Sequence, residues 1–162
     1  MPEIEYVEDR MESEELLERL CPPVRNWFKD KFPDFTEPQK VAIPRILNGE
    51  HLLLCSPTGS GKTLTAFLTI IDDLVRRSLD GSLPDAVQCV YISPIKALAN
   101  DIEKNLMGPL GEIKERYLPS RAKEIKVGLR TGDTPQSERE KMLRKPPHCL
   151  LYTSPSPRDQ CL

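Results

Sequence analysis

Apolar side chains recur along the chain at two spacings, one typical of helices and the other typical of strands. Helical spacing predicts amphipathic helices over residues 14–20, 24–32, 37–47, 64–79, 110–118 and 135–143. Short runs of β-forming residues predict strands over residues 52–55, 87–92 and 125–130. Residues 1–13 are acidic and lack periodicity, which predicts a frayed tail ahead of the first helix.

The order of these elements indicates the fold class. A strand, a helix and a second strand follow one another between residues 52 and 92, and this is the order of a βαβ unit with parallel strands. We therefore expect an α/β fold in which a parallel sheet is flanked by helices. Residues 1–20 would form an acidic tail and a short helix, and the folded domain would begin at residue 21.

A loop of small residues separates the first expected strand from the helix that follows it. The loop consists of Ser56, Pro57, Thr58, Gly59, Ser60, Gly61, Lys62 and Thr63. It fits the phosphate-binding pattern G-x-x-x-x-G-K-[ST], except that Ser56 stands at the first glycine position. Glycines let successive backbone N–H groups point at phosphate oxygens, and the helix N-terminus adds its positive dipole end. The pattern predicts a nucleoside triphosphate site in which Lys62 reaches the β- and γ-phosphates and Thr63 ligates Mg²⁺, and these two residues are the expected catalytic ones.

Thr36 and Gln39 stand just ahead of this loop and allow two roles. Their spacing is that of a capping box, which by itself accounts for both residues at the start of a helix. The amide of Gln39 also offers a donor and an acceptor, as recognition of an adenine edge requires. On the residues alone, both roles stay open.

Two further polar segments follow the second and third expected strands. The first contains Ser93, Pro94 and Lys96, and the second contains Arg130, Thr131 and Gly132. In a parallel sheet both would lie at the carboxyl edge, where open α/β sheets bind ligands. Lys96 falls in the first turn of a helix, where a cation is unfavourable, so it is either a surface charge or a partner for an anion. Thr134 and Pro135 predict an N-cap and a first helical residue after the second segment.

Composition narrows the class of protein without deciding its chemistry. The chain has 162 residues, of which 38% are hydrophobic and 30% are charged, as expected of one soluble globular domain. The acidic N-terminus is unlike a targeting peptide, so we expect a cytoplasmic protein. The five cysteines lack the spacing of a zinc site, and the net charge of −2 indicates no global attraction to nucleic acid. Any nucleic-acid binding must therefore depend on local basic residues.

Four of these segments together resemble motifs of superfamily 2 DEAD/DEAH-type helicases, particularly the large helicase-related (Lhr) type. Residues 36–39 are similar to the Q motif, 56–63 to motif I, 93–98 to motif Ia, and 130–135 to the Lhr-type segment ahead of motif Ib. In this superfamily a serine is normal at the first glycine position of motif I. The resemblance implies that residues 21–148 are part of a RecA-like helicase ATP-binding domain.

The resemblance also implies a function. It implies an ATP-dependent motor that uses Mg²⁺, tracks along single-stranded nucleic acid, with DNA favoured over RNA, and serves DNA repair. Gln39 would read adenine, while Lys62 and Thr63 would hold phosphate and Mg²⁺. The residues named above in the two polar segments would contact the sugar-phosphate backbone, a footprint that is independent of base sequence.

The last residues depart from the helicase pattern. After His148 the resemblance implies a strand, a Thr-Pro-Glu-Ser motif and later an Asp-Glu pair, whereas residues 149–162 read CLLYTSPSPRDQCL. Residues 149–159 coincide with one reading frame of a transposon adapter used in sequencing libraries, so we predict that residues 149–162 are a non-native tail. A chain that ends in this way would leave a sheet edge unpaired, would bind ATP weakly and would not hydrolyse it. Different codons over residues 149–159 would contradict this hypothesis.

Two other interpretations stay open on the sequence. One is a P-loop protein of another class, such as a small NTPase or a kinase, although no acidic switch or lid signature follows the second strand. The other is a naturally short module that binds ATP or nucleic acid without catalysis.

Overall fold

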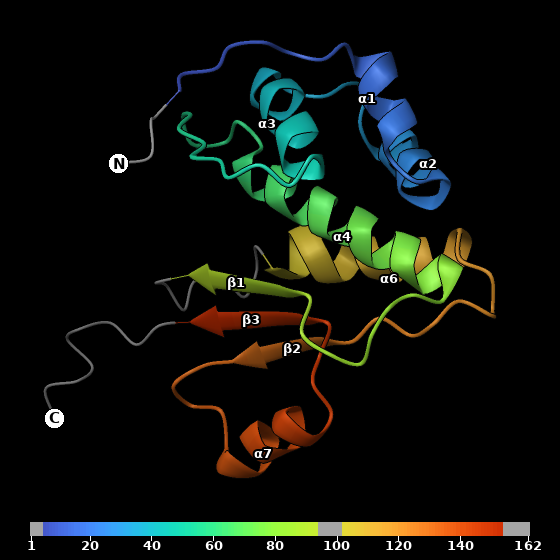
Figure 1. Ribbon diagram of the computed structural model, residues 1–162, viewed down its shortest axis with the longest axis vertical. Helices are drawn as coiled ribbons and strands as arrows, with labels where there is room; N and C mark the ends of the chain where they lie inside the picture. The colour runs from blue at the N-terminus through green and yellow to red at the C-terminus, as the bar shows by residue number, and fades with distance from the viewer. Residues whose placement is uncertain (1–4, 94–101, 154–162) are drawn as a thin grey trace, which may run out of the picture.

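The computed structural model describes residues 5–93 and 102–153, which form a helical layer over a small sheet (Figure 1). The described elements are α1 (Ser13–Arg19), α2 (Pro22–Lys31), α3 (Glu37–Leu47), α4 (Lys62–Asp80), β1 (Cys89–Ser93), the π-helical turn η2 (Glu103–Met107), α6 (Gly108–Arg116), β2 (Val127–Arg130), α7 (Gln136–Arg144) and β3 (Cys149–Thr153). The six helices predicted from apolar spacing are present to within a few residues, and the helix start predicted at Lys96 lies outside the described residues. Apolar spacing predicts these helices because all of them except α7 bury one stripe of side chains.

The described strands form one parallel sheet in the order β1-β3-β2. Cys149 of β3 lies opposite Cys89 of β1 and Val127 of β2, so the strands run in register from their first residues. Their carboxyl ends point to the side of the molecule on which the chain enters α4 (Figure 1). The expected α/β fold with a parallel sheet is therefore confirmed.

The central strand is built from residues that we predicted to lie outside the fold. In β3, Cys149, Leu151 and Thr153 are buried, and the intervening residues are half-buried. The run Cys-Leu-Leu-Tyr-Thr has the apolar and β-branched composition that suits a strand packed on both faces. Residues 149–153 therefore belong to the sheet, whereas the resemblance assigned residues 21–148 to the helicase domain. The adapter origin of residues 149–162 stays a prediction, and residues 154–162 lie outside the described part of the chain.

The strand predicted ahead of the phosphate loop does not form. Residues 51–57 carry no strand, and the side chain of Leu53 is 87% exposed. An apolar run becomes a buried strand only when other strands flank it, and none of the described strands pairs with this run. The expected βαβ unit therefore lacks its first strand.

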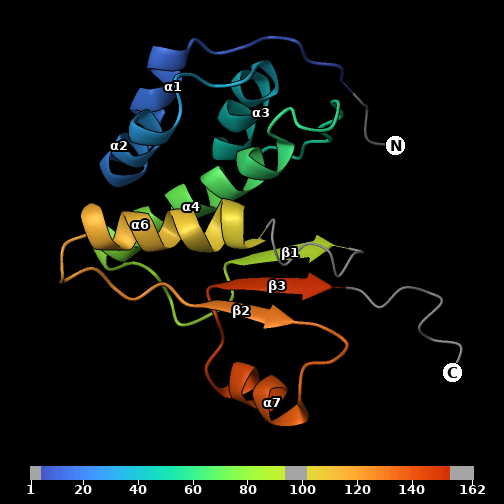
Figure 2. The same cartoon turned by 180° about the vertical axis from the view of Figure 1, so that it is seen from behind.

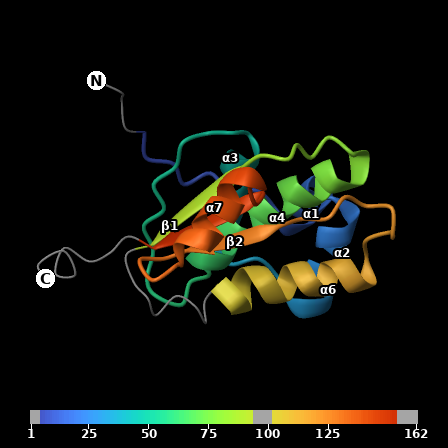
Figure 3. The ribbon, with the colours of Figure 1, turned by 90° about the horizontal axis from the view of Figure 1, so that it is seen from below.

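Helices α4 and α6 cover one face of the sheet, and α1, α2 and α3 lie on the outer side of α4 (Figures 1 and 2). The core joins these layers through Phe28 of α2, Phe67 and Ile71 of α4, and Leu151 of β3. Helix α7 lies on the other side of the strands (Figures 1 and 3) and buries no residue fully. None of the described helices is both long and apolar enough to cross a membrane.

A buried carboxylate connects the first helices to α4. Asp72 is fully buried in α4 and accepts a hydrogen bond from the backbone N–H of Cys21 at 2.6 Å. Its other oxygen accepts from Nε of Arg76 at 2.7 Å. A buried charge is tolerated only with such partners, so this contact fixes the start of α2 against α4. Burial raises the pKa of the Cys21 thiol to about 12, so that thiol stays protonated.

Candidate functional site

The phosphate loop joins α4 at the N-terminus of that helix. Gly59 and Gly61 have φ values of +80° and +88°, in the left-handed region that glycine adopts without strain. Gly61 is the N-cap residue of α4, so the loop meets the helix at its positive end. Thr63 follows in the first turn of α4 and is half-buried. The two glycines thus stand where the backbone of an anion-binding loop needs them.

Lys62 folds back into the loop. Its Nζ donates to the carbonyl of Ser56 and, at 2.6 Å, to the carbonyl of Pro57. The hydroxyl oxygens of Ser56 and Ser60 lie 2.5 Å apart and bridge the two sides of the loop. The loop is therefore closed on itself, and a phosphate could enter only if the ammonium group exchanged carbonyl oxygens for phosphate oxygens.

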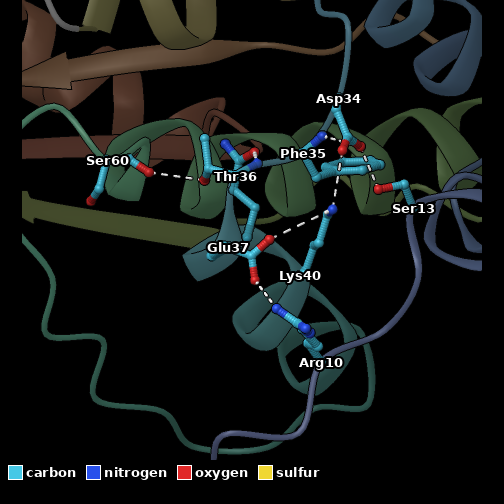
Figure 4. Close-up of polar contacts among 9 residues, drawn as sticks. Arg10, Ser13, Asp34, Phe35, Thr36, Glu37, Lys40 and Ser60 are labelled. Atoms are coloured by element: carbon cyan, nitrogen blue, oxygen red, sulfur yellow. Dashed lines mark hydrogen bonds and ion pairs between the residues drawn. The ribbon is translucent and has the colours of Figure 1, made fainter.

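Thr36 and Gln39 tie α3 to this loop. Both bonds of the capping box are present, and Oε1 of Gln39 accepts from the N–H of Thr36 at 2.9 Å. The hydroxyl of Thr36 donates to the carbonyl of Ser60 at 2.9 Å (Figure 4). Nε2 of Gln39 lies 3.5 Å from the carbonyl oxygen of Gly61, and the residue is only 2% exposed. The capping role is confirmed, and contact between Gln39 and adenine stays a prediction.

A charged network at the start of α3 holds the N-terminal residues in place (Figure 4). Arg10 pairs with Glu37 at 2.6 Å, and Lys40 lies 3.1 Å from Asp34 and 3.8 Å from Glu37. The hydroxyl of Ser13 also donates to Asp34, and this bond together with Lys40 holds the pKa of Asp34 below its ordinary value. The chain around Arg10 is therefore bound to α3, which the lack of sequence periodicity did not indicate.

A groove of about 950 Å³ opens between these N-terminal residues and the phosphate loop. Its walls are residues 5–8, one face of α3 (Glu37, Pro38, Val41 and Arg45) and residues 50–56. The backbone N–H of Met11 donates to the carbonyl of Lys40 at 3.1 Å and keeps the N-terminal wall against α3. Because the groove reaches Ser56, it adjoins the place where the loop would hold phosphate.

The segment after β2 lies on the same side of the sheet as the phosphate loop (Figure 1). Arg130 is the last residue of β2 and is half-buried, Thr131 is half-buried, and Gly132 is exposed. The hydroxyl oxygen of Thr134 accepts from the N–H of Thr131 at 2.8 Å. The prediction that Thr134 caps the next helix is wrong, because its side chain is used inside the loop and Pro135 occupies the N-cap position of α7.

Arg139 of α7 holds this loop, a role that the sequence pattern did not indicate. Its Nε donates to the carbonyl of Thr134 at 2.9 Å. Its Nη2 donates to the carbonyls of Gly132 at 2.9 Å and Thr131 at 3.3 Å. Backbone carbonyls leave no trace in a sequence pattern, so nothing distinguished Arg139 from the other basic residues of α7.

The segment after β1 is described only at its first residue. Ser93 ends β1 opposite Thr153 and is only 4% exposed. Pro94 and Lys96 lie outside the described residues. The structure therefore brings Arg130, Thr131 and Gly132 to the edge of the sheet that faces the phosphate loop, and places Ser93 at the same edge.

Comparison with known proteins agrees with this arrangement. A family model for the DEAD/DEAH box helicase matches residues 36–160. The chain is 46% identical over 158 residues to the ATP-dependent helicase Lhr-Core of Methanocaldococcus jannaschii, covering 96% of this chain and 19% of that protein. It is 54% identical over 135 residues to the Lhr-Core helicase of Methanothermobacter thermautotrophicus, covering 83% of this chain and 16% of that protein. The chain thus spans less than a fifth of the length of these relatives.

A solved structure shows the same likeness in three dimensions. The helicase Lhr of Mycobacterium smegmatis, bound to single-stranded DNA and AMP-PNP, superposes with a TM-score of 0.71 at 42% sequence identity. The superposition covers 85% of this chain and 17% of that chain.

Proposed function

This chain belongs to the DEAD/DEAH box helicase family, and from that premise we propose that it supplies the ATP-binding and single-strand-binding surfaces of an Lhr-type helicase. Membership in the family replaces the interpretation as a small NTPase or kinase of another P-loop class. The observation that carries the proposal is the phosphate loop at the N-terminus of α4, tied by Thr36 and Gln39 to α3. It lies on the same side of the sheet as the loop after β2.

ATP would enter by replacing contacts that the phosphate loop now makes with itself. Lys62 would release the carbonyls of Ser56 and Pro57 and bind the β- and γ-phosphates. The nucleoside would extend into the groove that reaches Ser56, with Gln39 as the proposed contact for adenine. The hydroxyl of Thr63 fits Mg²⁺, which usually takes one or two protein oxygens and completes its shell with waters and substrate phosphates. Bound there, Mg²⁺ would neutralise charge on the phosphates.

Single-stranded nucleic acid would lie along the carboxyl edge of the sheet. A cation at Arg130, the exposed backbone at Gly132 and the hydroxyl of Thr131 suit the sugar-phosphate backbone and carry no base specificity. Ser93, Pro94 and Lys96 would extend the same footprint. Because the M. smegmatis relative binds single-stranded DNA, we propose DNA as the strand for this chain as well. Binding should therefore weaken steeply as salt rises.

The test of the nucleotide site is titration of the 162-residue chain with AMP-PNP and Mg²⁺ by calorimetry. Lys62→Ala should weaken binding about 10- to 100-fold, because a hydrogen bond to a charged group contributes about 1.5–3 kcal/mol. Lys29→Ala removes an exposed lysine from α2, far from the loop, and serves as the matched control. Unchanged affinity in folded Lys62→Ala would contradict the proposed site.

Hydrolysis is proposed for the helicase and not for these 162 residues alone. The sequence contains no Asp-Glu pair, the group that the helicase resemblance assigns to Mg²⁺ binding and water positioning. We therefore expect no phosphate release above background when single-stranded DNA is added to this chain with ATP. Robust DNA-stimulated release would show that catalysis needs less of the helicase than proposed.

A further inference from the structure

The loop that follows β2 owes its shape to one side chain from the helix after it. The guanidinium of Arg139 bonds the carbonyls of Thr131, Gly132 and Thr134 at 3.3, 2.9 and 2.9 Å. Two side chains inside the loop complete the arrangement, since Thr134 accepts from the N–H of Thr131 and the hydroxyl of Thr131 accepts from the N–H of Asp133. Three carbonyls within four residues thus turn toward a single cation.

The direction of these carbonyls matters for an anionic ligand. A carbonyl oxygen carries partial negative charge, so carbonyls that faced a phosphate would repel it. Arg139, which extends from α7, donates hydrogen bonds to three of these carbonyls. Gly132 itself is exposed, and Arg130 at the end of β2 is half-buried.

We infer that Arg139 is a positioning residue for single-stranded nucleic acid, which it serves by holding residues 131–134 in the binding shape without itself touching a phosphate. This inference rests on the proposed function, since it assigns a cause to the affinity of the same surface. A planar guanidinium donates through separate nitrogens in a fixed fork, which lets it span several carbonyls. Lysine offers the same charge from one nitrogen and cannot span them in this way.

The test compares four variants of the chain in binding a fluorescein-labelled oligo(dT), measured by anisotropy at several salt concentrations. Arg139→Ala and Arg139→Lys should both weaken binding about 5- to 20-fold, because the loop must then be ordered on binding. Both should keep the wild-type slope of log Kd against log salt. Arg130→Ala should instead lower that slope by about one, as removal of a phosphate contact does. Arg144→Ala removes a 78% exposed arginine of the same helix that pairs only with Glu140 among the described residues, and it should change neither quantity.

A second measurement keeps the test independent of binding. In the protein without DNA, amide hydrogen exchange over residues 131–134 should speed up in both Arg139 variants and stay unchanged in Arg144→Ala. Restored affinity in Arg139→Lys, or a reduced salt slope in Arg139→Ala, would mean that Arg139 acts through its charge and would overturn the inference. If the folded wild-type chain does not bind oligo(dT) at all, the proposed function fails first, while the exchange measurement still reports on the loop.

Discussion

The phosphate loop and the loop after β2 both lie toward the carboxyl ends of the strands (Figure 1). Each is held by a basic side chain, but from opposite directions. In the phosphate loop, Lys62 satisfies carbonyls from within, at the place where phosphate oxygens would lie. In the loop after β2, Arg139 reaches in from α7 and donates to the loop's carbonyls, behind the surface proposed to bind single-stranded nucleic acid. The first loop must therefore exchange partners when its ligand arrives, whereas the second is already formed.

The two loops also differ in which neighbouring segment is firmly packed, the one after the loop or the one before it. The phosphate loop is anchored on its helical side by α3 and α4, but the preceding residues 51–57 belong to no described strand. The loop after β2 begins in a hydrogen-bonded strand but ends in α7, which buries no residue fully. Each loop thus has one firmly packed flank, so substitutions that loosen that flank should have the largest effects.

The largest effect is expected at the contact between the phosphate loop and α3. A Cβ at Gly61 would lie 2.8 Å from Nε2 of the buried Gln39 and 3.3 Å from the hydroxyl of Thr36, at a φ of +88°. Gly61→Ala should therefore combine backbone strain with displacement of Gln39 and destabilise the chain by about 2–4 kcal/mol in urea unfolding. AMP-PNP binding should weaken in the same variant, because Gln39 and the loop move together.

The matched control is Gly59→Ala in the same loop. Gly59 has a similar φ of +80°, but a Cβ there would meet nothing within 4 Å. The Gly59→Ala variant should lose only the stability that a left-handed alanine costs, about 1–2 kcal/mol. If the two variants were equally destabilised, the contact between Gln39 and Gly61 would contribute nothing, and the proposed coupling of α3 to the loop would be wrong.

A smaller effect should appear on the sheet side when the pH is lowered. His148 is fully buried; its Nδ1 accepts from the N–H of Lys126 at 2.9 Å, and its Nε2 has no hydrogen-bond partner among the described residues. Burial, together with the charges of Lys126 and Lys123, holds the pKa of His148 below its ordinary value of 6.5. The folded state thus binds the proton less readily than the unfolded state. Stability is therefore complete above pH 6.5 and is lost as the pH falls through the lowered pKa.

The measurement is urea unfolding between pH 7.5 and 5.5, a range above the ordinary titration of carboxylates. Over this range the wild-type chain should lose on the order of 1 kcal/mol, and amide exchange should speed up in β2 and β3 before α3 and α4. His148→Asn keeps an acceptor for the N–H of Lys126 and should flatten the pH dependence. His51→Asn changes an exposed histidine near the phosphate loop and should not. An unchanged pH dependence in His148→Asn would show that His148 does not cause the loss of stability at low pH.

Features set by local spacing could be predicted from the sequence. The capping box of Thr36 and Gln39, the glycines of the phosphate loop and the stripe of α4 each depend on residues a few positions apart. Local spacing gave the wrong role for Thr134, because a threonine beside a proline suits an N-cap and a closed loop equally well. In the structure this hydroxyl accepts from the N–H of Thr131, and Arg139 donates to the carbonyl of the neighbouring Gly132.

Features set by distant neighbours could not be predicted in this way. The apolar run at residues 52–55 resembles a buried strand, but pairing depends on what flanks it in space, and no described strand does. Residues 149–153 match a sequencing adapter, yet their composition is that of a strand and the register with β1 and β2 places them at the centre of the sheet. Strand formation depends on composition and partners, whatever the origin of the codons.

The smallest expected effect concerns the hydroxyl bridge that closes the phosphate loop. The hydroxyl oxygens of Ser56 and Ser60 lie 2.5 Å apart, and a phosphate that enters the loop must part its two sides. One hydrogen bond contributes about 0.5–1.5 kcal/mol, so Ser56→Ala should strengthen AMP-PNP binding about 2- to 10-fold and lower the unfolding free energy of the unliganded chain by a matching amount. Ser60→Ala breaks the same bridge and should act equally, and the double variant should gain nothing more, as expected for two partners of one interaction. Both serines lie in the phosphate loop and not in the loop after β2, so oligo(dT) binding should be the same in all three variants. Weaker AMP-PNP binding in Ser56→Ala would mean that its hydroxyl binds the nucleotide directly and that the closed loop does not oppose entry.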